Sequence, residues 1–195
     1  MTFLTGVARA QTCLGAAALL ALPLQAQSAQ PAAFQIAALF TSIRSGGTSS
    51  AGAGVETQIR FNRVFSGESF GAISIGIGGQ YTTHRESLDK LVITGLFLEP
   101  RWVPAFASSR LFPYLSGRVS TMRMNGTFRF AEDGTSTGTA FGAGGGFAVR
   151  LTRQTNFDAG AQLIRQEFGT IGSLVFKPFL TYTAKVGVTV GFPPR

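Results

Sequence analysis

Residues 179–192 read FLTYTAKVGVTVGF, and their alternation decides the fold class of the chain. One parity is apolar: Leu180, Tyr182, Ala184, Val186, Val188, Val190 and Phe192. The other parity is polar or small: Phe179, Thr181, Thr183, Lys185, Gly187, Thr189 and Gly191. Alternation at period two over this length predicts a β-strand with one apolar face. A tilted strand of about ten residues crosses a bilayer in a closed barrel, so we interpret this stretch as a membrane-crossing strand.

The same stretch carries a spaced motif, polar-x-Gly-x-x-hydrophobic-x-aromatic, formed by Lys185, Gly187, Val190 and Phe192. This spacing resembles the C-terminal assembly signal of bacterial outer-membrane β-barrel proteins. The resemblance implies that the barrel-assembly machinery reads these residues during biogenesis. The chain departs from the pattern after its aromatic residue, because residues 193–195 (PPR) follow it.

Composition favours one β domain. The chain has 195 residues, of which only 13% are charged, whereas Gly (25) and Phe (18) are abundant. Soluble domains usually carry about a quarter of charged residues. Each interior glycine would cost a helix about 1 kcal/mol, so this composition is unfavourable for a helical fold.

The N-terminus is typical of a cleaved secretory signal peptide, which we assign to residues 1–28. Arg9 supplies the positive charge, Cys13–Leu24 is the apolar region, and cleavage is expected after Ala26 or Ser28. No apolar segment reaches the roughly 20 residues that a membrane-spanning helix needs. Removal of the signal also removes the single cysteine, so the mature barrel domain, residues 31–195, is expected to contain no disulfide.

Seven further segments are strand-like, although the parity of Lys90–Trp102 is ambiguous, and they bring the expected strand number to about eight, an even number. They are Phe34–Ile43, Val55–Phe65, Phe70–Thr83, Lys90–Trp102, Leu111–Met124, Phe141–Leu151 and Asn156–Phe168. Tight turns are expected at Ser66–Ser69, Val103–Arg110 and Thr152–Thr155. Longer polar loops are expected at Ser45–Gly54, His84–Asp89, Asn125–Thr137 and Gly169–Leu174, the third with a small hairpin of its own.

The predicted fold is therefore all-β, an eight-stranded antiparallel up-and-down transmembrane β-barrel. With short turns on one side and longer loops on the other, the chain resembles the small outer-membrane barrels of the OmpA/OmpX type. That resemblance implies a bacterial outer-membrane protein with a non-enzymatic structural, envelope or surface-contact role. The loop Asn125–Thr137 is the expected contact surface.

An eight-stranded barrel has an interior filled by its own side chains. Seven charged residues are placed inside by their parity: Glu56, Arg60, Glu99, Arg101, Arg118, Asp158 and Lys185. Buried charges are costly unless matched, so we expect them to pair with one another. The alternative for the same residues is a narrow ion-conducting path.

The chain is basic, with a net charge of +8, but its arginines are scattered singly and do not indicate nucleic-acid binding. Seven basic residues fall near the predicted loop ends: Arg44, Arg85, Lys90, Arg123, Arg129, Arg165 and Lys177. Cations at this depth could contact outer-membrane lipid and the phosphates of lipopolysaccharide. The alternative is a solvated rim, partly neutralised by Glu86, Asp89, Glu132, Asp133 and Glu167.

Catalysis has one candidate, the run His84, Arg85, Glu86 and Ser87, because only there could a nucleophile, a base and an acid meet. Some small outer-membrane barrels are enzymes that modify lipid A. Adjacent loop positions do not fix the geometry of a triad, so a solvated loop histidine is the expectation. The glycine clusters do not complete a phosphate-binding motif, and no metal-ligand spacing is found. No cofactor is expected. Besides a lipid-modifying enzyme and a narrow channel, a soluble periplasmic lipid-binding barrel with inverted faces remains an alternative, because alternation alone does not distinguish inside from outside.

Overall fold

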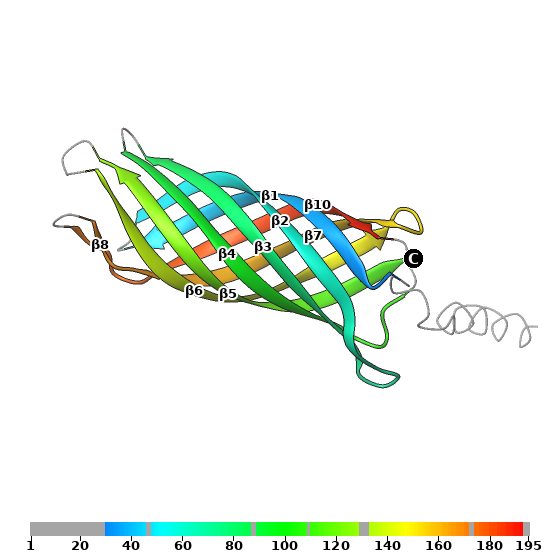
Figure 1. Cartoon of the computed structure of the whole chain (residues 1–195). Coiled ribbons are helices and arrows are strands. Elements are labelled where there is room, and N and C mark those ends of the chain that lie inside the picture. The colour runs from blue at the N-terminus through cyan, green and yellow to red at the C-terminus, as the bar shows by residue number, and fades with distance from the viewer. Residues whose placement is uncertain are drawn as a thin grey trace, which may run out of the picture.

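The computed structural model describes residues 30–45, 48–86, 89–108, 110–128, 133–171 and 174–192. Eight long strands close into one antiparallel barrel, in the order β1-β10-β7-β6-β5-β4-β3-β2 (Figure 1). Their bounds are β1 Ala32–Ser45, β2 Thr48–Gly67, β3 Gly71–Glu86, β4 Asp89–Val103, β5 Leu111–Thr127, β6 Gly134–Arg150, β7 Thr155–Phe168 and β10 Phe179–Gly191. Two short strands, β8 (Thr170–Ile171) and β9 (Leu174–Val175), pair separately.

Each long strand pairs with its neighbours in the sequence, and β10 closes the barrel against β1. This closing ladder runs from Ala33 opposite Gly191 to Arg44 opposite Leu180. A closed barrel satisfies every strand edge, which is what a bilayer requires of a β structure. The predicted up-and-down topology is confirmed.

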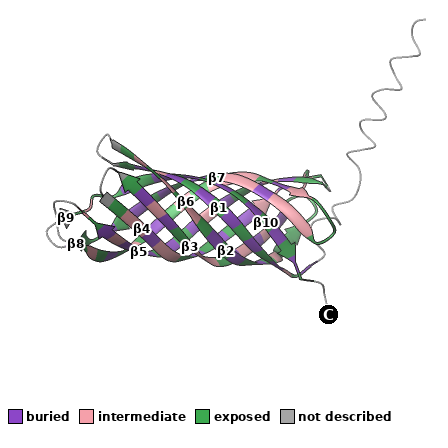
Figure 2. Cartoon of the chain, turned by 90° about the horizontal axis from the view of Figure 1, so that it is seen from above, coloured by how far each residue is buried: buried purple, intermediate pink, exposed green. Residues whose placement is uncertain are grey.

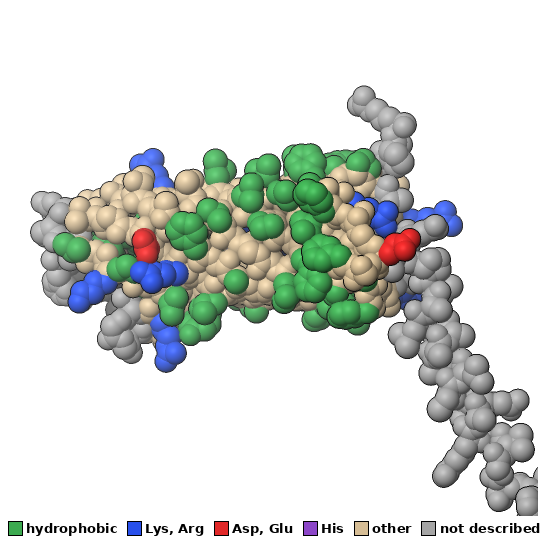
Figure 3. Space-filling view, turned by 90° about the horizontal axis from the view of Figure 1, so that it is seen from below, with side chains coloured by type: hydrophobic (Ala, Val, Ile, Leu, Met, Phe, Trp, Pro, Cys, Tyr) green, Lys and Arg blue, Asp and Glu red, His purple; other side chains and the backbone are tan. Residues whose placement is uncertain are grey.

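The side-chain faces are those of a membrane-spanning barrel. Figures 2 and 3 show exposed and buried residues alternating along each strand, with hydrophobic side chains over the middle of the outer wall. Ile77, Phe141 and Val186 are exposed on that wall, whereas Glu56 and Arg60 are buried inside. The inverted arrangement, in which apolar side chains would line a lipid-binding cavity, is therefore wrong.

The two ends of the barrel differ and are named here by what they carry. At the terminal end lie the ends of the described chain, Gln30 and Phe192, with the connections at 68–70, 104–110 and 151–154 (Figure 1). At the hairpin end lie the β1–β2, β3–β4 and β5–β6 connections and the β8–β9 pair. The described part of the chain contains no helix long and apolar enough to cross a bilayer.

The prediction of long loops is wrong at three places, Ser45–Gly54, His84–Asp89 and Asn125–Thr137, because the strands continue into each of them. At Ser45–Gly54, β1 ends at Ser45 and β2 already begins at Thr48. At His84–Asp89, β3 extends to Glu86 and β4 begins at Asp89. Glycine, serine and other small polar residues look like loop residues by composition, but here their backbone groups are paired in the ladder.

The Asn125–Thr137 loop is likewise shorter than expected. Asn125 pairs with Thr135 and Gly126 with Gly134, so both flanks belong to the β5–β6 ladder. A small hairpin lies between β7 and β10, where β8 and β9 pair Thr170 with Val175 and Ile171 with Leu174. The hairpin expected within Asn125–Thr137 falls partly on residues 129–132, which lie outside the described residues. The predicted signal peptide, residues 1–28, lies outside the described residues.

An apolar cluster fills the lumen at the hairpin end. Phe168 and Phe179 stack there with ring centroids 5.8 Å apart. Ile171, carried by β8, is 2% exposed within the same cluster. The members of the cluster are Ile43, Ile93, Met122, Met124, Ala140, Ile164, Phe168, Ile171 and Phe179. This end of the interior is therefore a packed hydrophobic plug.

We expect Gly187→Ala to destabilise the barrel at its closing seam. A Cβ atom at Gly187 would meet the carbonyl oxygen of Ile36 and the side chain of Ala37 on β1. Overpacking of this kind costs about 1–3 kcal/mol. The measurement is the free energy of unfolding in nonionic detergent micelles.

Gly79→Ala is the matched control for the seam. Its Cβ would have its nearest neighbours at 3.6 and 3.7 Å, which is ordinary contact, so stability should be unchanged or slightly raised. Equal destabilisation by the two substitutions would contradict the importance of the close approach at Gly187.

Candidate functional site

The middle of the lumen holds a cluster of charged side chains contributed by five strands. Its members are Glu56 and Arg60 on β2, Glu99 and Arg101 on β4, Arg118 on β5, Asp158 on β7 and Lys185 on β10. All are more than nine-tenths buried. Their inward positions agree with the period of two, in which alternate residues of a strand face the lumen.

Glu99 is the central acceptor of this cluster. Its Oε1 lies 2.7 Å from a guanidinium nitrogen of Arg60 and 3.3 Å from one of Arg101. Its Oε2 lies 2.7 Å from Arg118 and 3.0 Å from Lys185. One fully buried carboxylate therefore holds four cations from four different strands.

Two further carboxylates complete the cluster. Glu56 lies 2.6 Å from Arg118 and 3.2 Å from Lys185. Asp158 accepts a hydrogen bond from Arg101 at 2.6 Å and another from the Tyr114 hydroxyl at 2.9 Å. These bonds cross the lumen and connect strands that are not neighbours in the barrel, so the cluster stabilises the shape of the barrel's cross-section.

Neutral and aromatic side chains that the sequence analysis did not assign to the charge network support the same cluster. Gln162 donates to Glu99 at 2.8 Å, and Gln58 accepts from Arg60 at 3.0 Å. The Arg101 guanidinium lies 3.7 Å from the centre of the Tyr114 ring, and that of Arg118 lies 3.9 Å from Phe97. Each shares the inward parity of its strand, which is the signal that could have found it. Cation–π contacts of this kind are stronger in a desolvated site.

The cluster has more positive than negative charge. Four cations, Arg60, Arg101, Arg118 and Lys185, face three carboxylates, Glu56, Glu99 and Asp158. An unbalanced charge in a low-dielectric interior is costly unless other groups or ions compensate it.

The expectation of a solvated loop histidine at position 84 is wrong. His84 is 2% exposed, lies on β3 within the lumen, and its Nε2 is 2.7 Å from the Thr41 hydroxyl. Its Nδ1 has no hydrogen-bond partner among the described side chains, so no acid orients the ring. Arg85, the next residue, is exposed on the outer wall, and Ser87 lies outside the described residues. The proposed catalytic run is therefore split between two faces, because neighbouring strand residues point in opposite directions.

The residues of the C-terminal motif divide between the two faces of β10. Lys185 is buried in the charge cluster, and Gly187 lies at the seam against Ala37 of β1. Val190 and Phe192 are exposed on the outer wall at the terminal end. Two of the four motif positions thus also have structural roles in the closed barrel.

Six of the seven predicted rim cations are described, and all six are exposed at the hairpin end: Arg44, Arg85, Lys90, Arg123, Arg165 and Lys177. Arg129 lies outside the described residues. Arg165 has an exposed acidic partner, Glu167, at 2.9 Å. Since the strands continue beyond their predicted ends, these cations lie on the barrel wall and the segment before β10 rather than in long loops.

Metal ligands do not gather in the described part of the chain. No group of three His, Cys, Asp or Glu side chains is placed there to hold a metal ion.

Comparison with solved structures identifies the fold. The chain is similar to Neisserial surface protein A, with a TM-score of 0.66 and 16% sequence identity over 83% of this chain and 97% of that one. It is also similar to Ail, the attachment invasion locus protein of Yersinia pestis, with a TM-score of 0.53 and 11% identity over 83% and 97% of the two chains. A second structure of Ail, in complex with the heparin analogue sucrose octasulfate, matches with a TM-score of 0.54. No protein-family model and no curated protein sequence matches the chain. The predicted resemblance to small outer-membrane barrels is confirmed at the level of the fold.

We expect Glu99→Gln to destabilise the barrel strongly, because it removes the negative charge that four buried cations share. Breaking a buried ion pair on one side costs about 3–5 kcal/mol. The free energy of unfolding in micelles, together with the folded-versus-boiled gel shift, measures the effect. The exposed control Glu167→Gln removes an equal charge and should cost about 1 kcal/mol or less.

A variant that fails to fold would still be informative. Combining Glu99→Gln with Arg60→Gln removes one cation and one carboxylate together, so it should recover part of the lost stability. Equal effects of Glu99→Gln and Glu167→Gln, or no recovery in the double variant, would contradict the central role of Glu99.

Proposed function

We propose that this protein is a non-enzymatic barrel of the bacterial outer membrane with its hairpin end toward the cell exterior. The exposed cations at that end bind the phosphates of lipopolysaccharide. The observation that carries the proposal is the placement of Arg85 directly opposite Lys90 on β3 and β4. Both side chains are exposed. Like charges directly opposite in a sheet are destabilising, so the pair is a natural site for an anion that bridges them.

A second pair of cations supports the same proposal. Arg44 on β1 and Arg165 on β7 both pair with Leu180 of β10, one from each side. Since neighbouring strands lie about 4.8 Å apart, the two backbones are separated by about 10 Å across the exposed leucine. One guanidinium group on each side of an apolar side chain suits a ligand that has both phosphate and acyl parts.

The depth of these cations fits the headgroup region of a bilayer. Along each strand, the same outward face carries an exposed apolar side chain further toward the terminal end. Going from the cation toward the terminal end, the next exposed apolar side chain on this face is Phe40 for Arg44, Tyr81 for Arg85 and Leu163 for Arg165. The basic residues therefore lie at the boundary of the apolar belt, where basic side chains meet anionic lipid heads.

Export and assembly complete the proposal. The N-terminal signal predicted at residues 1–28 would deliver the chain across the inner membrane. The barrel-assembly machinery would then read Lys185, Gly187, Val190 and Phe192. The split of His84 and Arg85 between two faces supports a role without catalysis, since no nucleophile, base and acid converge at His84 among the side chains that the structure describes.

Sulfated sugars are a second candidate ligand for the same cations. Ail, whose fold this chain shares, was crystallised in complex with the heparin analogue sucrose octasulfate. Sulfate and phosphate present similar anionic oxygens to arginine. Competition between sucrose octasulfate and lipopolysaccharide would show whether the two ligands use one surface.

We expect the full chain, folded in nonionic micelles, to bind lipopolysaccharide in preference to the same lipid stripped of its phosphates. The double variant Arg85→Gln/Lys90→Gln should weaken this binding at least about tenfold, since each cation near an anionic lipid surface is worth about 1 kcal/mol. Titration calorimetry at two salt concentrations measures both effects.

The matched control is Arg110→Gln/Arg153→Gln, which removes two exposed cations at the terminal end. This variant has the same net charge as the first and should bind normally. Equal binding of the two lipids, or equal weakening by the two double variants, would refute the proposal.

A further inference from the structure

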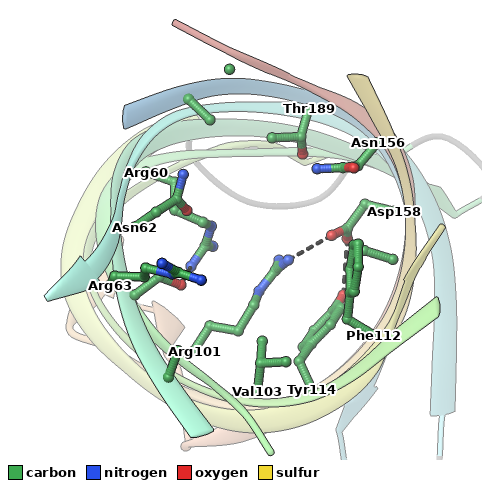
Figure 4. Close-up of a pocket in the computed structure, with 15 residues that line it drawn as sticks. Arg60, Asn62, Arg63, Arg101, Val103, Phe112, Tyr114, Asn156, Asp158 and Thr189 are labelled. Carbon is green, nitrogen blue, oxygen red and sulfur yellow. Dashed lines mark hydrogen bonds and ion pairs between the residues drawn. The ribbon is translucent and has the colours of Figure 1, made fainter. Parts of the chain in front are cut away.

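A pocket lined by charged, polar and apolar side chains opens at the terminal end of the lumen, beside the charge cluster (Figure 4). It offers about 90 Å³ to molecules the size of water. Arg60, Arg63 and Arg101 line it together with the side chains of Asn156 and Thr189. In Figure 4, Arg60 and Arg63 extend inward from β2, while Arg101 crosses the lumen toward Asp158. Three guanidinium groups and one carboxylate thus surround a single space.

The backbone is distorted at the position that brings Arg63 to this pocket. The β2–β3 register shifts between Phe61, which pairs with Ile75, and Phe65, which pairs with Ile73. Within this bulge Arg63 has a φ of 54°, a left-handed conformation that residues other than glycine rarely adopt. Bulges at barrel rims redirect side chains, and strained backbone is retained where the surrounding structure or a function requires it.

Donors at the pocket lack partners. The Nε of Arg60 and the Nε of Arg101 are both buried, and neither has a hydrogen-bond acceptor within the described protein. The remaining guanidinium nitrogens of Arg60 bind Ser74, Gln58 and Glu99. Buried donors without acceptors are rare, and such donors are places where a water molecule or an ion binds.

The carboxylate of the pocket is already engaged. Asp158 accepts from Arg101 on one oxygen and from Tyr114 on the other, at 2.6 and 2.9 Å. Both carboxylate oxygens of Asp158 therefore already have a donor. The charge cluster beneath the pocket has four cations against three carboxylates, so the net charge around the space is positive.

We propose that this pocket is a binding site for a small oxyanion, a phosphoryl or carboxyl group entering from the terminal end. Planar guanidinium groups match such anions in shape and charge. The amide of Asn156 and the hydroxyl of Thr189 add neutral donors from the opposite wall. The volume suits one such group, and an apolar ligand would leave the unpaired arginine donors without acceptors.

The test uses the full chain folded in nonionic micelles, with inorganic phosphate and acetate as probes and chloride at equal ionic strength as the reference. Phosphate or acetate should raise the unfolding temperature above that in chloride, and titration calorimetry should show a saturable site. Arg63→Gln should weaken that site at least about tenfold, because it removes one charge-assisted hydrogen bond. A preference between the two probes would identify the phosphoryl or the carboxyl group as the ligand.

Arg153→Gln is the matched control, because Arg153 is an exposed cation at the same end and does not line the pocket. It should leave the binding of the probe anions unchanged. Asn156→Asp keeps the shape of the side chain and adds a carboxylate to the pocket, so it should abolish binding by repulsion. The same change at the hairpin end, Asn125→Asp, should have no effect. Equal stability in all three salts, or equal weakening by Arg63→Gln and Arg153→Gln, would overturn the proposal.

Discussion

One buried carboxylate organises the interior of this barrel. Glu99 accepts from four cations that arrive on β2, β4, β5 and β10, and it is fully shielded from solvent. In most soluble proteins the apolar core supplies cohesion, but here most large apolar side chains face lipid, and an apolar cluster inside the barrel is found at the hairpin end. Cohesion across the middle of the lumen therefore depends on matched charges and hydrogen bonds, which favour the strand register that pairs them.

The period of two predicted this interior well. Lys185 lies between Ala184 and Val186, and the alternation alone placed the ammonium group inside and its neighbours outside. The identity of the partners could not be predicted, because pairing depends on the shear of the closed barrel, which brings together residues far apart in sequence. Glu99 differs from Glu56 only in its geometric position, and no sequence pattern marks it as the central acceptor.

The ends of the strands were predicted least well. Residues such as Ser49, Gly52 and His84 have loop-like composition, yet they belong to strands that rise beyond the apolar belt. Outside the hydrocarbon, a strand no longer needs apolar side chains, so composition loses its information while the backbone ladder continues. The bulge at Arg63 was missed although the alternation breaks there, since Arg63 follows Phe61 on the apolar parity and Val64 follows Asn62 on the polar one. The wall at the hairpin end is consequently a rigid sheet with fixed spacing between its cations.

The place of Lys185 in the last strand has a consequence for the order of folding. Its ammonium group reaches Glu56 and Glu99, which lie 129 and 86 residues earlier in the chain. Before β10 docks, three arginines face three carboxylates, and Lys185 then brings the fourth cation together with its hydrogen bonds to Glu56 and Glu99. Closure of the wall and burial of the surplus cation therefore occur in a single event. The last strand therefore completes the hydrogen bonds of Glu56 and Glu99 in the same step that completes the backbone ladder.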